Sequence, residues 1–230
     1  MKNINSTVRL LTAMVFSLGL LACQTAPPSI QMGPDAELSY DGLHIVENSQ
    51  ADVAWARPDL DLSGYTKIMT ASAGIEYRQV KNKGRTSVDR SRGGPYFIDD
   101  KARAKFETLV AEVFTEELQK SERFTIVDEP GPDVLIIWGA LLDVTSYVPP
   151  DPVGGRSEVF LTSVGEATLV LELRDSETNT ILARSVDRRA AETIGRTFQR
   201  TNSVTSASEV KRLIRFWGTR LREGLDGFSQ

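Results

Sequence analysis

Few side chains in this sequence could do covalent chemistry, and the most specific of them is a thiol. Cys23 is the only cysteine in the chain, and it directly follows Leu20-Leu21-Ala22. An apolar run from Leu10 to Leu21 leads up to it, and Lys2 gives the segment a positive start. This order is typical of a secretory signal peptide, and the run is shorter than the roughly 20 residues needed to cross a membrane as a helix. We therefore predict that residues 1–22 form a signal peptide that ends at a modified cysteine.

The tetrad from Leu20 to Cys23 resembles the bacterial lipobox. The resemblance implies that diacylglycerol is attached to the Cys23 thiol, that the chain is cleaved before Cys23, and that the new amino terminus is acylated, with palmitate as a typical chain. One acyl chain holds only marginally, at about 0.8 kcal/mol per buried methylene, whereas two or three make the attachment lasting. Gln24, in place of an aspartate, implies transfer to the outer membrane, facing the periplasm. The alternative is an ordinary signal peptide that is cleaved elsewhere and takes an inert Cys23 with it.

The other candidates for catalysis are one histidine and two pairs of carboxylates. His44 is the only histidine, and the sequence has no Gly-x-Ser-x-Gly elbow to supply a nucleophile beside it. A zinc site would need several His or Cys ligands. Asp99 and Asp100 precede an expected helix, and Asp128 and Asp133 bound an expected turn, where capping and hydrogen bonding explain carboxylates. We predict no catalytic residue, no metal site and no cofactor; the alternative is a cell-envelope hydrolase that uses such paired carboxylates.

Clustered arginines offer a contact for an anionic ligand. Residues 81–94 are polar, basic and contain glycine, which indicates a long mobile loop, and a further arginine pair ends an expected strand near the basic final helix. Phospholipid headgroups, lipopolysaccharide phosphates or peptidoglycan carboxylates would suit such a site. The alternative is a solvated basic surface that aids solubility. The candidate contact residues are Arg85, Arg90, Arg92, Arg188 and Arg189.

Composition narrows the class of protein. The formal net charge of −4 and the pI of about 5.2 lack the basic balance typical of nucleic-acid binding, so we expect no nucleic-acid partner. If Cys23 carries lipid, no cysteine is left for a disulfide, and the packed core must supply the stability. The chain that remains after residues 1–22 is long enough for one domain and a tether.

The tether is expected over residues 23–64, where the apolar residues show no sustained period. An extended segment with several prolines can lie against a domain without regular structure. Its prolines are Pro27, Pro28, Pro34 and Pro58. Residues 65–230 are then expected to form a single domain.

Within residues 65–230, apolar periodicity predicts two helices and a sheet. Residues 101–121 repeat apolar side chains at helical spacing, and Ser206 with Glu209 forms a capping box for a final amphipathic helix. Alternating or β-branched runs predict strands over 65–78, 124–127, 134–145, 164–175 and 181–189. We predict an α+β two-layer sandwich, with a mostly antiparallel sheet of four to five strands and the two amphipathic helices on one face.

Short stretches along the chain are together similar to a known family. They are Asp41-Gly42-Leu43, Trp55-Ala56-Arg57-Pro58, Pro130-Gly131-Pro132-Asp133, Val164-Gly165-Glu166-Ala167, Asp187-Arg188-Arg189-Ala190 and Phe216-Trp217. In order and spacing they resemble bacterial lipoproteins of domain-of-unknown-function family 3313, over nearly all of the mature chain. The resemblance implies an envelope lipoprotein without an established activity, and it carries over no catalytic residue.

These observations predict a membrane-anchored, non-enzymatic binding or assembly module in the periplasm. Its expected partner, besides the membrane, is another envelope protein or an anionic envelope component. Two alternatives stay open: the carboxylate hydrolase, and a subunit of a secretion or export assembly whose exposed sheet edge pairs with a neighbour. A cleft that holds two facing carboxylates with raised pKa values would favour the hydrolase.

Overall fold

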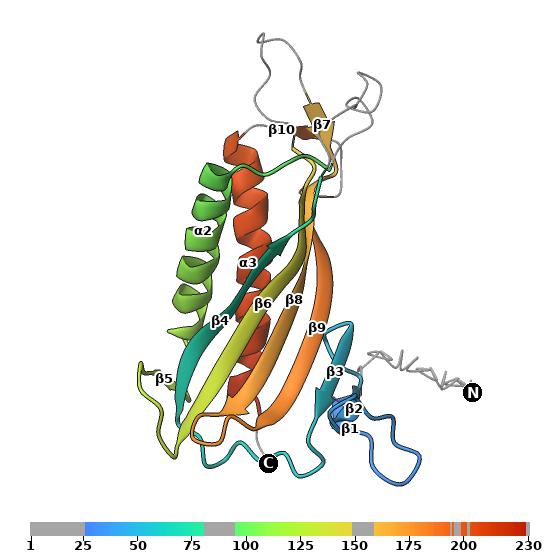
Figure 1. Cartoon of the computed structure of the whole chain (residues 1–230), viewed down its shortest axis with the longest axis vertical. Helices are drawn as coiled ribbons and strands as arrows, with labels where there is room; N and C mark the ends of the chain where they lie inside the picture. The colour runs from blue at the N-terminus through green and yellow to red at the C-terminus, as the bar shows by residue number, and fades with distance from the viewer. Residues whose placement is uncertain are drawn as a thin grey trace, which may run out of the picture.

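The computed structural model describes residues 26–80, 95–148, 159–193, 195, 199–201 and 203–228. The predicted signal peptide, Cys23 and the basic segment 81–94 lie outside these residues. Within the described part, two long helices, α2 (Asp100–Leu118) and α3 (Ser203–Asp226), pack side by side against one face of a large sheet (Figure 1). No helix in the described part is long and apolar enough to cross a membrane.

The main sheet of the described residues has eight strands in the order β1-β2-β3-β9-β8-β6-β4-β5. Its strands are β1 (Ser29–Ile30), β2 (His44–Glu47), β3 (Val53–Ala56), β4 (Lys67–Tyr77), β5 (Thr125–Ile126), β6 (Val134–Ser146), β8 (Ser163–Asp175) and β9 (Ile181–Glu192). Strand β4 runs parallel to both of its neighbours, β5 and β6, and the other pairs are antiparallel. A separate two-stranded ribbon joins β7 (Val159–Leu161) to β10 (Gln199–Thr201).

This architecture corrects the predicted fold class. The expected sandwich with a mostly antiparallel sheet of four to five strands is wrong, because the structure is a mostly β fold built on one mixed eight-stranded sheet. Strands β1, β2 and β3 come from the segment 23–64, and their runs of two to four residues are too short to show a period. The chain passes through α2 between β4 and β6, and such a crossover places two strands in parallel.

The core lies between the helices and the central strands. Along β6, Leu135, Ile137 and Leu141 alternate toward the helices and are almost completely buried. Val113 of α2 and Ile214 of α3 meet this face, and both are at most 1% exposed. Asp99 caps α2 by accepting a hydrogen bond from the Ala102 backbone N–H at 2.7 Å. The apolar stripes of both helices are therefore buried on the sheet, which fixes the helices in place.

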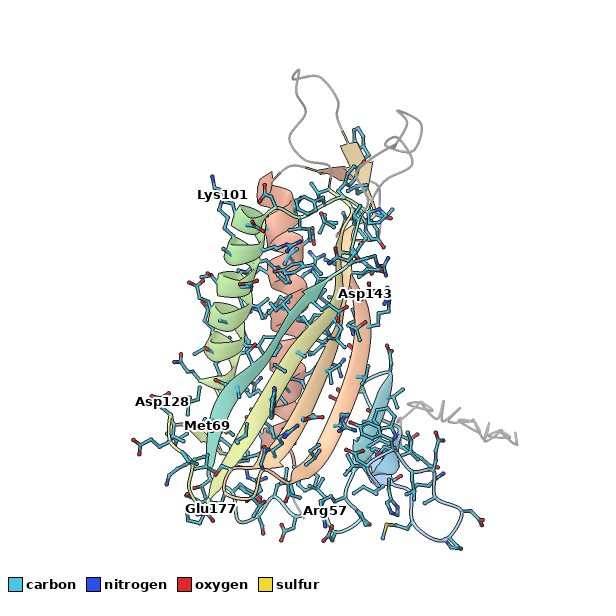
Figure 2. The ribbon with its side chains drawn as sticks, viewed as in Figure 1. Arg57, Met69, Lys101, Asp128, Asp143 and Glu177 are labelled. Carbon is cyan, nitrogen blue, oxygen red and sulfur yellow. The ribbon has the colours of Figure 1, made fainter. Side chains whose placement is uncertain are left out.

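Near one end of the sheet, register shifts interrupt the ladders of β6 and β8. Asp143 has a left-handed φ of 55°, and the pairing between β6 and β8 skips from Leu142 to Thr145. Opposite this bulge, a Cβ at Gly165 would overlap the carbonyl oxygen of Thr145, so only glycine allows the close approach. The bulge turns Asp143 toward the face of the sheet that carries no helices (Figure 2).

Candidate functional site

The structure describes two of the five arginines predicted to contact an anionic ligand. Arg85, Arg90 and Arg92 lie outside the described residues. Arg188 and Arg189 are neighbours on β9, so their side chains leave the sheet on opposite faces. They therefore do not form one cationic site, and each has its own set of acidic partners.

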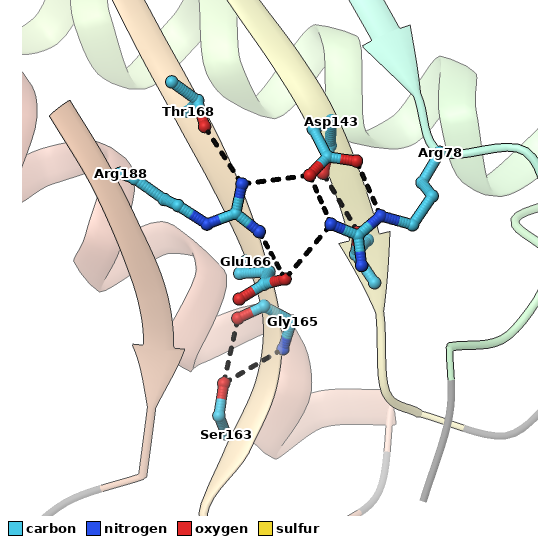
Figure 3. Close-up of polar contacts among 8 residues, drawn as sticks. Arg78, Asp143, Ser163, Gly165, Glu166, Thr168 and Arg188 are labelled. Atoms are coloured by element: carbon cyan, nitrogen blue, oxygen red, sulfur yellow. Dashed lines mark hydrogen bonds and ion pairs between the residues drawn. The ribbon is translucent and has the colours of Figure 1, made fainter. Parts of the chain in front are cut away.

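Arg188 belongs to a charge cluster on the helix-free face, which Figure 3 shows in close-up. Its Nη1 lies 2.9 Å from Asp143 Oδ2, and its Nη2 lies 2.7 Å from Glu166 Oε1. Arg78 donates from Nε to Asp143 Oδ1 at 2.6 Å. The hydrogen bond from Arg78, followed by that from Arg188, lowers the pKa of Asp143 to about 2, although partial burial opposes the shift. Two arginines and two carboxylates thus balance each other, which leaves little net charge to attract an anion.

Arg189 lies on the helix side and holds a buried carboxylate. Its Nε donates to Asp187 Oδ2 at 2.6 Å, and its guanidinium lies 4.6 Å from the centre of the Phe216 ring. Asp187, 6% exposed, also accepts a hydrogen bond from the indole Nε1 of Trp217 at 2.7 Å. Arg189 therefore pairs with a carboxylate that connects β9 to α3.

A second charge cluster lies farther along the helix-free face. The guanidinium of Arg184 is bidentate to Asp41, at 3.0 and 2.7 Å, and its Nε donates to Glu172 at 2.7 Å. Arg174 also donates to Glu172, and its guanidinium lies 3.9 Å from the centre of the Trp138 ring. The hydrogen bonds from Arg184 lower the pKa of Asp41 to about 2. Because Asp41 precedes β2, this cluster connects the N-terminal strands to the centre of the sheet.

One carboxylate of each pair considered for hydrolysis, Asp99 and Asp133, has a structural partner. Asp133 accepts hydrogen bonds from Thr66 Oγ1 at 2.7 Å and from Lys67 Nζ at 3.2 Å, and these lower its pKa. A general acid at neutral pH needs the opposite shift. Asp128 and the start of α2, where Lys101 follows Asp100, lie far apart along the long axis of the molecule (Figure 2). None of these four aspartates lines the apolar groove described below.

His44 also makes a structural contact. Its Nδ1 lies 2.7 Å from the carbonyl oxygen of Gln31, in the segment between β1 and β2. Among the described residues, no three His, Cys, Asp or Glu side chains gather as metal ligands would.

Among the described residues lies an apolar groove of about 410 Å³. It lies between the C-terminal half of α3 and strands β3, β8 and β9 on the helix side of the sheet. Leu171 and Leu173 of β8 line it, together with Leu221 of α3 and Phe228 just beyond that helix. The volume falls in the range of small-molecule sites, roughly 300–1,000 Å³.

Small residues create the space in this groove. Ala54 pairs with Ser185, and Ala56 pairs with Ala183, so two cross-strand pairs of short side chains line the β3 and β9 wall. On the helix wall, a Cβ at Gly224 would meet no atom within 4 Å. The groove thus lies where β3 and β9 extend the sheet, and the short side chains of these two strands leave its space open.

Charged groups reach the groove only at a few lining positions within the described residues. The carboxylates that line it, Asp187 and Glu223, pair with Arg189 and Arg222 respectively. Arg220, an exposed lining residue of α3, donates to the side-chain amide oxygen of Gln50. The groove was not predicted from the sequence; its only advance signal is the run of small residues at alternate positions in β3 and β9.

These features define a mostly β protein with two helices on one face of a single sheet and an apolar groove beside the second helix. The chain belongs to the DUF3313 family of proteins of unknown function, whose model matches residues 36–221. The family resemblance predicted from the sequence is thereby confirmed. No curated protein matches the sequence.

Three solved structures share features of this fold at low similarity. Protein XCC0632 of Xanthomonas campestris, of family DUF330, is 13% identical, with 73% of this chain and 86% of that chain covered and a TM-score of 0.40. A PelC dodecamer of Paraburkholderia phytofirmans is 12% identical, with 69% and 89% covered and a TM-score of 0.33. A neuraminyllactose-binding hemagglutinin homologue of Helicobacter pylori is 10% identical, with 72% and 84% covered and a TM-score of 0.32.

Proposed function

We propose that this DUF3313 protein is a lipid-anchored module of the bacterial cell envelope that binds an envelope component without catalysing a reaction. The anchor is the lipid expected on Cys23, which would hold the domain at the outer membrane on the periplasmic side. The observation that carries the binding role is the apolar groove beside α3, because an open concave surface of this kind is the usual place for a ligand. The partner is another envelope protein or an anionic envelope molecule.

The charge clusters support a binding role over hydrolysis. Asp41, Asp133 and Asp143 all have pKa values lowered by hydrogen bonds from cationic or hydroxyl groups, so each stays ionised at neutral pH. Carboxylates of this kind stabilise ion pairs and are poor proton donors.

The anchor is tested by Cys23→Ser in cells that produce the full chain. We expect the wild-type protein in the membrane fraction, released only by detergent, and the variant either unprocessed or in the soluble periplasmic fraction. Gln24→Ala serves as the matched control, because it changes the neighbouring residue and keeps the thiol. Detergent-dependent membrane attachment of a processed Cys23→Ser protein would refute the anchor.

An assembly subunit is a second candidate, favoured by the outer edge of β4. In the described part of the chain, β5 covers this edge only at Lys67 and Ile68. The stretch from Thr70 to Gly74 is exposed, and unpaired N–H and C=O groups on such an edge can pair with a strand of another protein. A photo-crosslinking residue at position 70 should then capture one defined partner in cells, whereas the same residue at Thr108, on the exposed side of α2, should not. Identical products from both positions would count against edge pairing.

A further inference from the structure

The groove beside α3 has an apolar interior and a basic residue at its opening. Leu60, Leu171, Leu173 and Leu221 line the interior, and Arg220 is an exposed lining residue on α3. The Arg220 guanidinium lies 5.0 Å from the centre of the Phe216 ring and donates to Gln50, an uncharged partner. An alkyl chain suits the leucine-lined part, and a carboxylate or phosphate suits the guanidinium.

The groove is concave and of limited volume. A flat protein interface buries about 800 Å² on each partner, whereas a space of 410 Å³ between a helix and a sheet matches a small, slender ligand. The short side chains of Ala54, Ala56 and Ala183 line one wall, and the open space at Gly224 lies on the other. A single unbranched chain can lie between two such walls.

The first described residues place the groove close to the expected anchor. Pro28 and Ile30 are among the lining residues, and Pro28 is five positions after Cys23. A fully extended chain spans at most about 3.6 Å per residue, so a linker of five residues can reach at most roughly 18 Å. A lipid on Cys23 would therefore hold the groove near the bilayer surface, and this step alone rests on the proposed anchor.

Proximity to a bilayer makes such a site easy to load. A methylene is buried from water both in a bilayer and in an apolar groove, and each environment favours it over water by about 0.8 kcal/mol. Transfer of an acyl chain between the two therefore has little net cost. The unfavourable part is passage through water, and a short distance reduces it.

We propose that this groove binds one acyl chain of an anionic membrane lipid, with the head group of the lipid at Arg220. The acyl chain lies between α3 and the β3–β9 wall. The ligand comes from the bilayer and is distinct from the chains expected on Cys23.

The test uses a chain that starts at residue 24 and therefore lacks Cys23. It keeps every contact described above, because these lie within residues 26–228. The probe is a dansylated undecanoic acid, whose fluorescence rises in an apolar site, with palmitate as the competitor. We expect saturable binding of one probe per chain and displacement by palmitate. Absence of saturable binding would overturn the proposal, and because Cys23 is missing, it would leave the anchor hypothesis unaffected.

Gly224→Leu tests whether the probe occupies the groove. The added side chain enters open space in a helix, where leucine is more favourable than glycine by about 0.8 kcal/mol, so the fold should be at least as stable. Affinity for the probe should fall by at least about tenfold, since hydrophobic pockets discriminate single methylenes by that much. Ala104→Leu, which adds a similar side chain on the exposed side of α2, is the control and should not change it. Equal affinities of the two variants would overturn the proposal.

Arg220→Gln tests the position of the head group. Palmitate binding should weaken about three- to fivefold, as expected for an exposed charge pair, while binding of the uncharged hexadecanol should stay the same. Equal losses for the acid and the alcohol would refute the head-group assignment. The lipidated full-length protein should bind the probe as the truncated chain does. If only the chain without Cys23 binds it, the protein's own acyl chain fills the groove, which would overturn the bilayer lipid as the occupant.

Discussion

The two faces of the sheet differ in how their side chains are paired and covered. On the helix-free face, Arg78, Arg184 and Arg188 pair with acidic residues of neighbouring strands and of the segment before β2. On the helix face beside α3, small side chains line an open apolar groove instead. On the helix-free face these arginines form ion pairs within the chain, whereas the helix face keeps an open apolar surface in the groove.

This difference separates residues that maintain the fold from residues that are available to a ligand. Of the arginines predicted from the sequence, the two that the structure describes, Arg188 and Arg189, have acidic partners within the chain, so their charges are largely neutralised. The groove is lined mainly by apolar residues, many of them alanine and leucine, which attract no attention in the sequence. We therefore expect a ligand to bind in the open groove, and we expect the ion pairs to stabilise the fold.

A tryptophan on each face gives the largest contrast. Trp217 belongs to α3, is 3% exposed, and donates its indole N–H to Asp187. Trp138 is half-buried on the other face of the sheet, where the Arg174 guanidinium lies over its ring. Trp217→Ala should cost about 4 kcal/mol in the free energy of unfolding, because it opens a cavity and leaves a buried carboxylate without one donor. Trp138→Ala should cost about 2 kcal/mol. Urea unfolding of both variants measures the difference, and equal losses would contradict the assignment of the core to the helix face.

The two charge clusters on the helix-free face should differ in how much they contribute to the free energy of unfolding, which is a smaller effect than that of the tryptophans. The Arg184 side chain is 8% exposed and its cluster is nearly closed, whereas the Arg188 side chain is 43% exposed. Arg184→Met should reduce the free energy of unfolding by about 3 kcal/mol, because it removes both hydrogen bonds from Arg184 to Asp41 and leaves Glu172 with Arg174 as its remaining arginine partner. Arg188→Met should cost at most about 1 kcal/mol, as solvent screens its pairs. Thermal unfolding that ranks the two variants in the reverse order would show that burial does not set the strength of these pairs.

The smallest expected effect is the loss of stability at low pH when Asp143, in the more exposed cluster, is protonated. The pKa of Asp143 is lowered to about 2 in the folded chain, mainly by Arg78, and is near 3.9 in an unfolded one. Its ionised form therefore stabilises the fold above pH 4, and this contribution is lost as the pH falls toward 2. Because Asp143 is about a third exposed, we expect the wild type to lose about 1 kcal/mol more than Asp143→Asn over this range. Unfolding curves measured between pH 4 and 2 that stay parallel for the two proteins would contradict this.

The helices could be predicted from the sequence, but the extent of the sheet could not. The helix predicted over residues 101–121 is α2, which runs from Asp100 to Leu118. The final helix forms as well, although it begins at Ser203, before the capping box at Ser206. Strand β3 has only four residues and gains its order from pairing with β9, where Ala56 meets Ala183, 127 positions further along the chain. Local sequence patterns do not indicate pairing between such distant residues, so the predicted sheet has fewer strands than the structure.

The candidate site was even less accessible from the sequence. Arg188 and Arg189 were predicted as one cationic contact, but an adjacent pair on a strand points to two faces. The acidic partners of Arg188, at positions 143 and 166, come from β6 and β8 and reach it only through the sheet register. A groove is a gap between elements, and residue types alone do not show where two walls fail to meet.

The close approach of Gly165 to Thr145 has a consequence for how this family can diverge. Any side chain at position 165 would collide with the Thr145 carbonyl oxygen, so a relative can replace this glycine only if the bulge at Asp143 changes too. The same bulge directs Asp143 to Arg78 and Arg188, so such a relative should also lose or rearrange those ion pairs. Positions 143, 165 and 188 are therefore expected to vary together among homologous sequences, as one inherited unit.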